Sequence, residues 1–187
     1  MNPIEFLTSE LNAKDLYNGT LDLKRNALLN HHVGFETNIY FIESGSVKIF
    51  FLNNDEEHII RFGYQNNLIT FLDSFLTGGK TDFYIQTLKK TTVKYISKTQ
   101  FMDFLHSNEI YLKIWLELLE ALLFDQLERE KDILIQSPKE RYKRVLKRSP
   151  KLFQEIPNTH IANYLRMSPE TLSRLKNLDL NQGLDEI

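Results

Sequence analysis

The sequence has 187 residues, with 23 Lys and Arg against 25 Asp and Glu, and 42% of its residues are hydrophobic. This length suits one ordinary domain or two small ones, and the hydrophobic share excludes a wholly disordered chain. The absence of Cys excludes disulfides, a thiolate nucleophile and Cys-ligated zinc or iron–sulfur clusters. Because we find neither a secretion signal nor an apolar run of about 20 residues, we expect a cytoplasmic protein with no membrane partner.

Residues 39–96 are rich in β-branched and aromatic side chains, and turn residues such as Gly45 interrupt them. Short runs of this kind predict strands. Their regular spacing is typical of an antiparallel barrel or sandwich. We expect strands at 39–42, 46–51, 58–62, 83–88 and 92–96.

A long helix is predicted over residues 108–136, which contain neither Gly nor Pro. Just before it, Ser97 and Gln100 fit a capping box that starts a shorter helix. The first half of the long helix is apolar around much of its girth and needs two covering surfaces. A near-heptad recurrence indicates the same helix of a second subunit as one of them, the alternative being a central core helix in a monomer. The recurring residues are Leu112, Leu116, Leu119, Leu123, Gln126, Leu127 and Glu130.

The C-terminal fifty residues predict a further set of helices. Ser137, Pro138 and Glu140 have the pattern of a helix N-terminus and mark the expected domain boundary. Residues 158–176 then predict two short helices joined by a turn, with Ser168 as the cap of the second. Apolar positions on their inner faces would form a small core, which is typical of a helix-turn-helix. These positions are Ile161, Ala162, Leu165, Met167, Leu172 and Leu175.

Charge is uneven along the chain, since residues 106–137 carry 3 basic and 7 acidic side chains whereas residues 138–176 carry 10 basic and 3 acidic ones. A basic module on an otherwise acidic chain is the electrostatic pattern of a phosphate-binding part. A solvated helix face rich in Lys and Arg would look the same. As a set, the side chains expected to attract phosphate, some of which would face away, are Lys139, Arg141, Lys143, Arg144, Lys147 and Arg148.

The second short helix carries the side chain types that read DNA. Arg174 can donate two hydrogen bonds to guanine, and Glu170 can accept one from cytosine. Ser and Thr hydroxyls can contact bases or phosphates. The expected DNA-binding residues are Thr159, Ser168, Pro169, Glu170, Thr171, Ser173, Arg174 and Lys176.

Taken together, residues 34–48 and 161–174 resemble the Crp/Fnr family of bacterial transcription regulators. The resemblance implies an α+β chain with a cyclic-nucleotide-binding-type antiparallel β-barrel of the jelly-roll type at 1–107. It further implies a dimerisation helix at 108–136 and a helix-turn-helix domain at 137–187. By the same resemblance the partners are double-stranded DNA with a near-palindromic site, a second copy of the chain and RNA polymerase, with an unknown small-molecule effector or none.

The sequence departs from the family pattern at three places. Thr70-Phe71 and Thr81-Asp82 stand where cyclic-nucleotide-binding members have Gly-Glu and Arg-Ser pairs. An Asp beside a phosphate without an Arg is electrostatically unfavourable, so we expect a degenerate pocket without tight cyclic AMP or cyclic GMP binding and no cofactor. Pro169 replaces a base-reading Arg of many members, which puts a family-type half-site in doubt. Arg166 stands where a turn Gly is usual, and little chain remains after Lys176 for a wing.

Two other functions would use parts of the same sequence. A metal-dependent enzyme of the cupin type would need several convergent His side chains, but the adjacent His31 and His32 would point to opposite faces of a strand, leaving His58. We find no phosphate loop and no nucleophile motif, and therefore expect neither an enzyme nor a metal site. The other alternative is a ligand-sensing or interaction module whose helical tail does not bind DNA.

Overall fold

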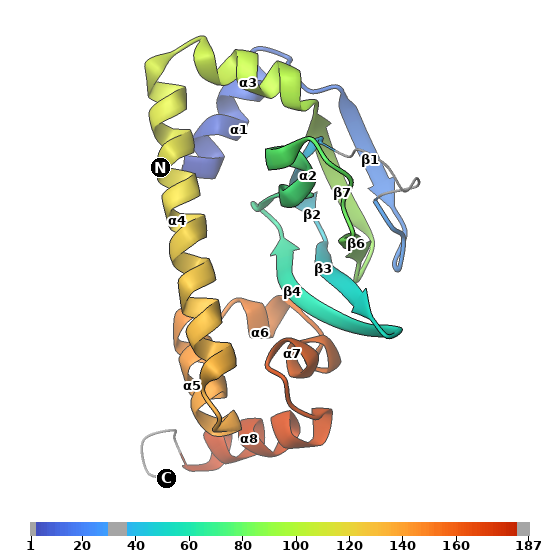
Figure 1. Cartoon of the computed structure of the whole chain (residues 1–187), viewed down its shortest axis with the longest axis vertical. Helices are drawn as coiled ribbons and strands as arrows, with labels where there is room; N and C mark the ends of the chain where they lie inside the picture. The colour runs from blue at the N-terminus through green and yellow to red at the C-terminus, as the bar shows by residue number, and fades with distance from the viewer. Residues whose placement is uncertain (1–2, 30–36, 183–187) are drawn as a thin grey trace.

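The computed structural model describes residues 3–29 and 37–182. In the described residues a helix comes first and seven strands follow, with a short helix inserted between the fifth and the sixth strand. A series of helices forms the rest of the chain (Figure 1). The helices are α1 (Pro3–Ala13), α2 (Leu72–Thr77), α3 (Lys98–His106), α4 (Glu109–Leu134), α5 (Pro138–Arg148), α6 (Leu152–Glu155), α7 (Asn158–Tyr164) and α8 (Pro169–Gln182). The strands are β1 (Gly19–Leu23), β2 (Ile39–Ser44), β3 (Ser46–Asn53), β4 (Glu56–Tyr64), β5 (Leu68–Thr70), β6 (Tyr84–Thr87) and β7 (Thr91–Ile96).

The strands form two antiparallel sheets, one in the order β1-β7-β2-β5 and one in the order β4-β3-β6. Both sheets contribute to one apolar core, which includes Ile42 and Val93 from the first sheet and Val47 and Ile85 from the second. The expectation of a barrel needs correction, because the described strands do not close into one continuous ladder. Since the two sheets bury one face each against the other, the arrangement is a two-sheet sandwich.

The turn between β2 and β3 carries the chain from one sheet to the other. Gly45 has a φ of 97° there, and a Cβ added to it would lie 2.3 Å from Thr91 Oγ1. Glycine alone tolerates both conditions, which explains the residue that the sequence places in this tight turn. The short strands β1 and β5 were not predicted from the sequence, since five and three residues give little alternation to detect.

Helix α3 begins at the expected N-cap, and Asn108, where the long helix was expected to start, is the N-cap of α4. Ser97 Oγ accepts from the Gln100 amide (3.3 Å), and Asn108 Oδ1 accepts from the Ile110 amide (2.9 Å). The expected capping box is only half formed, because the side chain of Asn18 rather than that of Gln100 binds the Ser97 amide. A side chain brought from far along the chain thus replaced the local partner.

The long helix α4 packs at its N-terminal half against α1, α3 and the first sheet, where Tyr111 and Trp115 enter a core with Phe41 and Phe101. It then continues beyond the sheets and meets the C-terminal helices at its other end (Figure 1). No helix in residues 3–29 and 37–182 has the length and apolar composition required to cross a bilayer.

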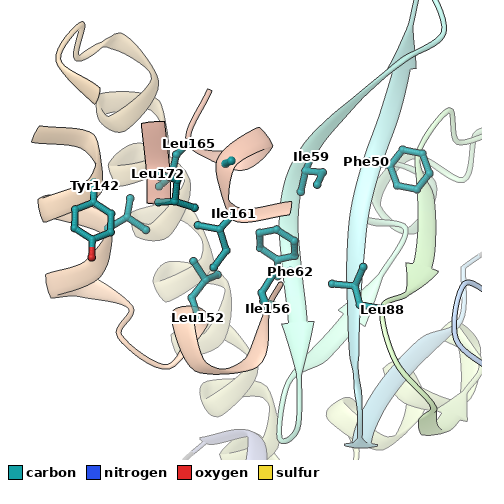
Figure 2. Close-up of a cluster of buried hydrophobic side chains, with 12 residues drawn as sticks. Phe50, Ile59, Phe62, Leu88, Tyr142, Leu152, Ile156, Ile161, Leu165 and Leu172 are labelled. Carbon is teal, nitrogen blue, oxygen red and sulfur yellow. The ribbon is translucent and has the colours of Figure 1, made fainter. Parts of the chain in front are cut away.

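The C-terminal helices pack on the second sheet as well as on one another. Figure 2 shows this core, in which Ile59 and Phe62 of β4 lie beside Ile156 and Ile161. The ring of Phe62 contacts that of Tyr164 with a centroid distance of 5.3 Å. This shared core holds α7 against the edge strand β4.

Candidate nucleic-acid interface

The helices α7 and α8, here called the helix pair, are joined by the turn at residues 165–168. The inner face of the helix pair forms the predicted small core, since Ile161, Ala162, Leu165 and Leu172 are fully buried. Ser168 caps α8 by accepting a hydrogen bond from the Thr171 amide at 3.2 Å. The apolar spacing and the cap therefore set the two helices as the sequence indicates.

Arg166, which stands where a turn Gly is usual, adopts a left-handed conformation with a φ of 52°. For an L-residue this costs on the order of 1 kcal/mol. The carbonyl oxygens on either side of the turn are held by a neighbouring guanidinium: Arg141 Nε donates to Leu165 O (2.8 Å) and Arg141 Nη2 donates to Arg166 O (2.9 Å). These bonds stabilise the strained turn.

The outer face of the helix pair presents most of the predicted DNA-binding residues to solvent. Thr171 and Lys176 are half-buried, and Lys176 Nζ donates to Asn158 Oδ1 (2.9 Å). The exposed members of the predicted set are Thr159, Ser168, Pro169, Glu170, Ser173 and Arg174. The structure thus brings the set onto one helix pair.

Two charged side chains stand on the first two turns of α8. The Glu170 backbone amide, the Ser168 hydroxyl and the charge of Arg174 hold the pKa of the Glu170 carboxyl below its ordinary value, so Glu170 is an acceptor at neutral pH. Arg174 has a weak contact with Thr171 Oγ1 (3.4 Å). Its guanidinium retains donors that can reach a base edge or a phosphate.

The expectation that Arg141 attracts phosphate is wrong. Its side chain is 8% exposed, and besides the turn carbonyls it donates to Ile135 O (2.6 Å) and Gln136 O (3.0 Å) at the end of α4. An amphipathic pattern cannot separate a cation that binds carbonyls from one that faces water. Arg141 is a structural link between α4 and the helix pair.

Arg144 and Arg148 also turn toward α4, contrary to the expectation. Both bind the fully buried Asp132, through Arg144 Nε (3.0 Å) and Arg148 Nη2 (2.6 Å). Arg144 Nη2 also contacts Glu128 (2.9 Å). These bonds neutralise acidic side chains of the long helix, which explains why an acidic segment is followed by a basic one. Lys147 is exposed and stays a phosphate-binding prediction.

Asn163, which was not singled out from the sequence, joins the helix pair to the edge of β4. Its Oδ1 accepts from the Ile59 amide (3.1 Å) and its Nδ2 donates to Glu57 O (2.9 Å). Lys89 and Glu155 add an ion pair at 2.8 Å between the sheet side and α6. These partners are between 66 and 106 residues apart, so no local pattern could indicate them.

The four residues aligned with the nucleotide-binding pairs do not converge on an anion site. Phe71 is buried within the core between the sheets, and Thr70 Oγ1 donates to Asn38 O (2.9 Å). Thr81 Oγ1 donates to Asp73 Oδ1 (2.9 Å), and Asp82 is exposed. None of the four brings a positive charge.

One side of α4 exposes large apolar side chains. Leu116 and Leu123 are seven residues apart, as are Leu127 and Leu134, and all four are at least half exposed. Leu119, a member of the predicted heptad, instead packs partly against the core of its own chain. The unpartnered apolar surface consists of Ile110, Leu116, Leu123, Phe124, Leu127 and Leu134.

The described residues contain no group of three or more His, Asp or Glu side chains placed to hold a metal ion. His58 stacks on Phe51 with a centroid distance of 5.2 Å. His31, His32 and Gly34, which entered the sequence analysis, lie outside the described residues.

Comparison with known proteins found no matching family model and no matching curated sequence. Similar solved structures do exist. CooA from Carboxydothermus hydrogenoformans, as a mutant, superposes with a TM-score of 0.75 at 17% identity, covering 98% of this chain and 86% of that one. FixK2 from Bradyrhizobium japonicum gives 0.72 at 15% identity over 88% and 85% of the two chains. The Thermus thermophilus catabolite activator protein gives 0.56 at 17% identity over 97% and 88%.

The chain has the Crp/Fnr fold. The resemblance noted from the sequence is therefore confirmed in three dimensions, over nearly the whole length of these regulators. At identities of 15–17% the likeness is one of fold, and the side chains that would read DNA must be argued from this chain. In this version of the Crp/Fnr fold, α8 continues as a helix to Gln182, so residues 177–182 do not form the strands of a wing.

Proposed function

We propose that this protein is a DNA-binding transcription regulator of the Crp/Fnr type and that α8 is its recognition helix. The observation that carries the proposal is the division of α8 into two faces. Leu172 is buried in the shared core, whereas Glu170, Ser173 and Arg174 are exposed together. A helix fixed from behind with polar groups in front is the form that enters a major groove. The fold supports the same function, and so do the exposed cations Lys147 and Arg174.

The regulator acts as a homodimer that pairs through the exposed apolar side of α4. Surface Leu side chains at seven-residue spacing, as in the pairs Leu116/Leu123 and Leu127/Leu134, suit the seam of a two-stranded coiled coil. Pairing two copies of α4 would cover these side chains and place two recognition helices on one DNA face. Their half-sites would lie about 34 Å apart on a near-palindromic sequence.

Residues 1–107 form the sensor part of the regulator, and they do not respond to cyclic AMP. The side chain of Phe71 occupies the core, and Asp82 would repel a phosphate. In this proposal residues 108–136 form the dimerisation helix and residues 137–187 form the DNA-binding domain.

Selection of bound sequences from a randomised DNA pool tests the function directly, followed by competition at increasing salt. We expect an enriched near-palindrome whose affinity falls steeply with salt, because phosphate contacts release counterions. Enrichment of no sequence, together with no retention of DNA at low salt, would contradict the proposal. That result would favour a sensing or interaction module without DNA binding.

A further inference from the structure

Four charged side chains join α5 to the last turns of α4. Glu128 and Asp132 are four residues apart on α4, and Arg144 and Arg148 are four residues apart on α5, so each pair lies on one face of its helix. Asp132 accepts from Arg144 Nε (3.0 Å) and from Arg148 Nη2 (2.6 Å). Glu128 accepts from Arg144 Nη2 (2.9 Å). These four residues are here called the charge cluster.

The charge cluster fixes the orientation of α5 more than it adds to the stability of the fold. The side chain of Asp132 is fully buried, and that of Glu128 is 16% exposed. Replacing a buried ion pair by apolar groups is often neutral or stabilising, whereas a buried charge that loses its partner is strongly unfavourable. A rotation of α5 on α4 would separate Asp132 from the two guanidinium groups. The cluster therefore favours one placement of α5 on α4.

Helix α5 in turn holds the proposed recognition helix α8 at two points. Arg141 donates to the carbonyl oxygens of Leu165 and Arg166, in the turn that precedes α8. In the second half of α8, the carboxylate of Asp179 accepts from the Tyr142 hydroxyl at 3.1 Å. Tyr142 is 2% exposed, so this donor belongs to a side chain that is fixed in the core. We therefore expect α8 to move together with α5.

The same turns of α4 carry the proposed dimer seam. Leu127 and Leu134 are exposed, whereas Asp132 lies between them in the sequence and faces α5. Neither Gly nor Pro, the usual causes of a sharp kink, occurs in α4. Residues 135–137 join α4 to α5, and Arg141 binds two carbonyl oxygens of this short link. The seam, the charge cluster and α8 thus form one continuous rigid path.

We propose that the charge cluster sets the separation of the two recognition helices and makes the regulator specific for one spacing between its half-sites. This inference rests on the proposed function and deepens it. Moving one half-site by one base pair shifts it by about 3.4 Å along the DNA and turns it by about 34°. A rigid dimer cannot follow this change without losing contacts of one recognition helix. Asp132 is thus a positioning residue, which acts on DNA recognition through α5.

A gel-shift series tests the inference with the near-palindrome that the randomised pool yields, after its half-sites are moved one base pair closer or further apart. We expect the wild type to lose at least about tenfold in affinity for either change, the equivalent of losing a base contact. Asp132→Asn removes the charge with almost no change in shape, and it should lose at most about threefold because α5 can then tilt. Asp125→Asn, the same change at an exposed position of α4, should lose as much as the wild type.

A distance measurement without DNA tests the placement of α8 separately. Because the chain has no Cys, Asn177→Cys at an exposed position of α8 provides a single spin-label site per chain. Double electron–electron resonance should give one narrow distribution of distances between the two labels of a dimer. Asp132→Asn should broaden this distribution, and Asp125→Asn should not. If circular dichroism shows that Asp132→Asn does not fold, Glu128→Gln, at the less buried carboxylate of the cluster, takes its place in both experiments.

An unchanged spacing preference in Asp132→Asn would overturn the inference and leave the DNA-binding proposal intact. Equal affinity of the wild type for all three spacings would also overturn it, because the recognition helices would then not be held at one separation. Failure of the randomised pool to yield any sequence would overturn the proposed function and, with it, the spacing specificity. In that case the spin labels would still support or overturn the fixed placement of α8.

Discussion

The side-chain amide of Asn163 binds the edge of β4 as a neighbouring strand would, accepting from the Ile59 amide at 3.1 Å and donating to Glu57 O at 2.9 Å. An edge strand exposes unpaired backbone groups, and here a helix of the C-terminal region satisfies two of them. Asn163 thus adds a polar contact to the shared apolar core that holds the helix pair against the sheets.

Asn163→Asp tests this contact with almost no change in shape. The carboxylate keeps an acceptor for the Ile59 amide, but it loses the donor and repels Glu57 O. We expect a loss of about 1–2 kcal/mol in unfolding free energy and faster hydrogen exchange of the Ile59 amide. The same isosteric change at the exposed Asn177 is the control. Equal stability and exchange in the two variants would show that the contact is weak in solution.

The second prediction concerns Arg141, which links the end of α4 to the helix pair. It donates to four carbonyl oxygens, two at the end of α4 and two in the turn. Arg141→Met leaves these acceptors unsatisfied, so we expect a loss of about 3 kcal/mol or more, measured by urea unfolding. Arg174→Met, the same change at an exposed Arg, should cost less than about 0.5 kcal/mol. Similar midpoints for both variants would argue against a structural role for Arg141.

The local signals in the sequence were sufficient for the N-termini of α3, α4, α5 and α8, whereas the helices α1, α2 and α6 were not predicted. Ser137 and Ser168 cap α5 and α8 because capping depends on residues three positions apart. The buried spacing of Ile161, Leu165 and Leu172 likewise follows from the helical period. Such features could be predicted since cause and effect lie within one or two turns of the chain.

The direction of the cations in α5 could not be predicted in this way. Charge counting put Arg141 and Arg144 in the phosphate-attracting set without showing which of its members face away. Their partners lie on α4 and in the turn of the helix pair. Helix α5 has a strong amphipathic pattern, but the acceptors that turn Arg141 inward are backbone carbonyls, which leave no mark in the sequence.

The proposed dimer makes a third prediction. Leu123 is 63% exposed on the apolar side of α4, and Leu76 of α2 is also 63% exposed. Leu123→Asp would bury a carboxylate in the seam between two helices, which costs several kcal/mol, so we expect the mass of a single chain in sedimentation equilibrium. Leu76→Asp should keep the mass of the wild type. A dimer that survives Leu123→Asp would place the interface elsewhere.

Arg174 makes a prediction about base recognition. If its guanidinium grips guanine, Arg174→Ala should weaken the selected site by about 1–3 kcal/mol and relax the preference at one base pair. Lys147→Ala removes an exposed cation outside α8, and it should lower affinity for all sequences and reduce the salt slope by about 1. A gel-shift titration over single-base variants of the site separates the two. A uniform loss with Arg174→Ala would identify Arg174 as a phosphate contact instead.

The last prediction concerns acid stability. His160 of α7 is half-buried. Burial and, to a smaller extent, the charge of Lys48 lower the pKa of its imidazole, and this outweighs Glu57, which acts in the other direction. The folded chain therefore binds fewer protons at this site than the unfolded chain, whose His has a pKa of about 6.5. The contribution of His160 to stability is complete above about pH 6.5 and falls as the pH is lowered through that value toward the folded pKa.

Thermal unfolding between pH 8 and pH 5 should show a steeper loss of stability for the wild type than for His160→Gln. His106→Gln, at an exposed position of α3, should keep the slope of the wild type, and an identical slope in His160→Gln would contradict the prediction.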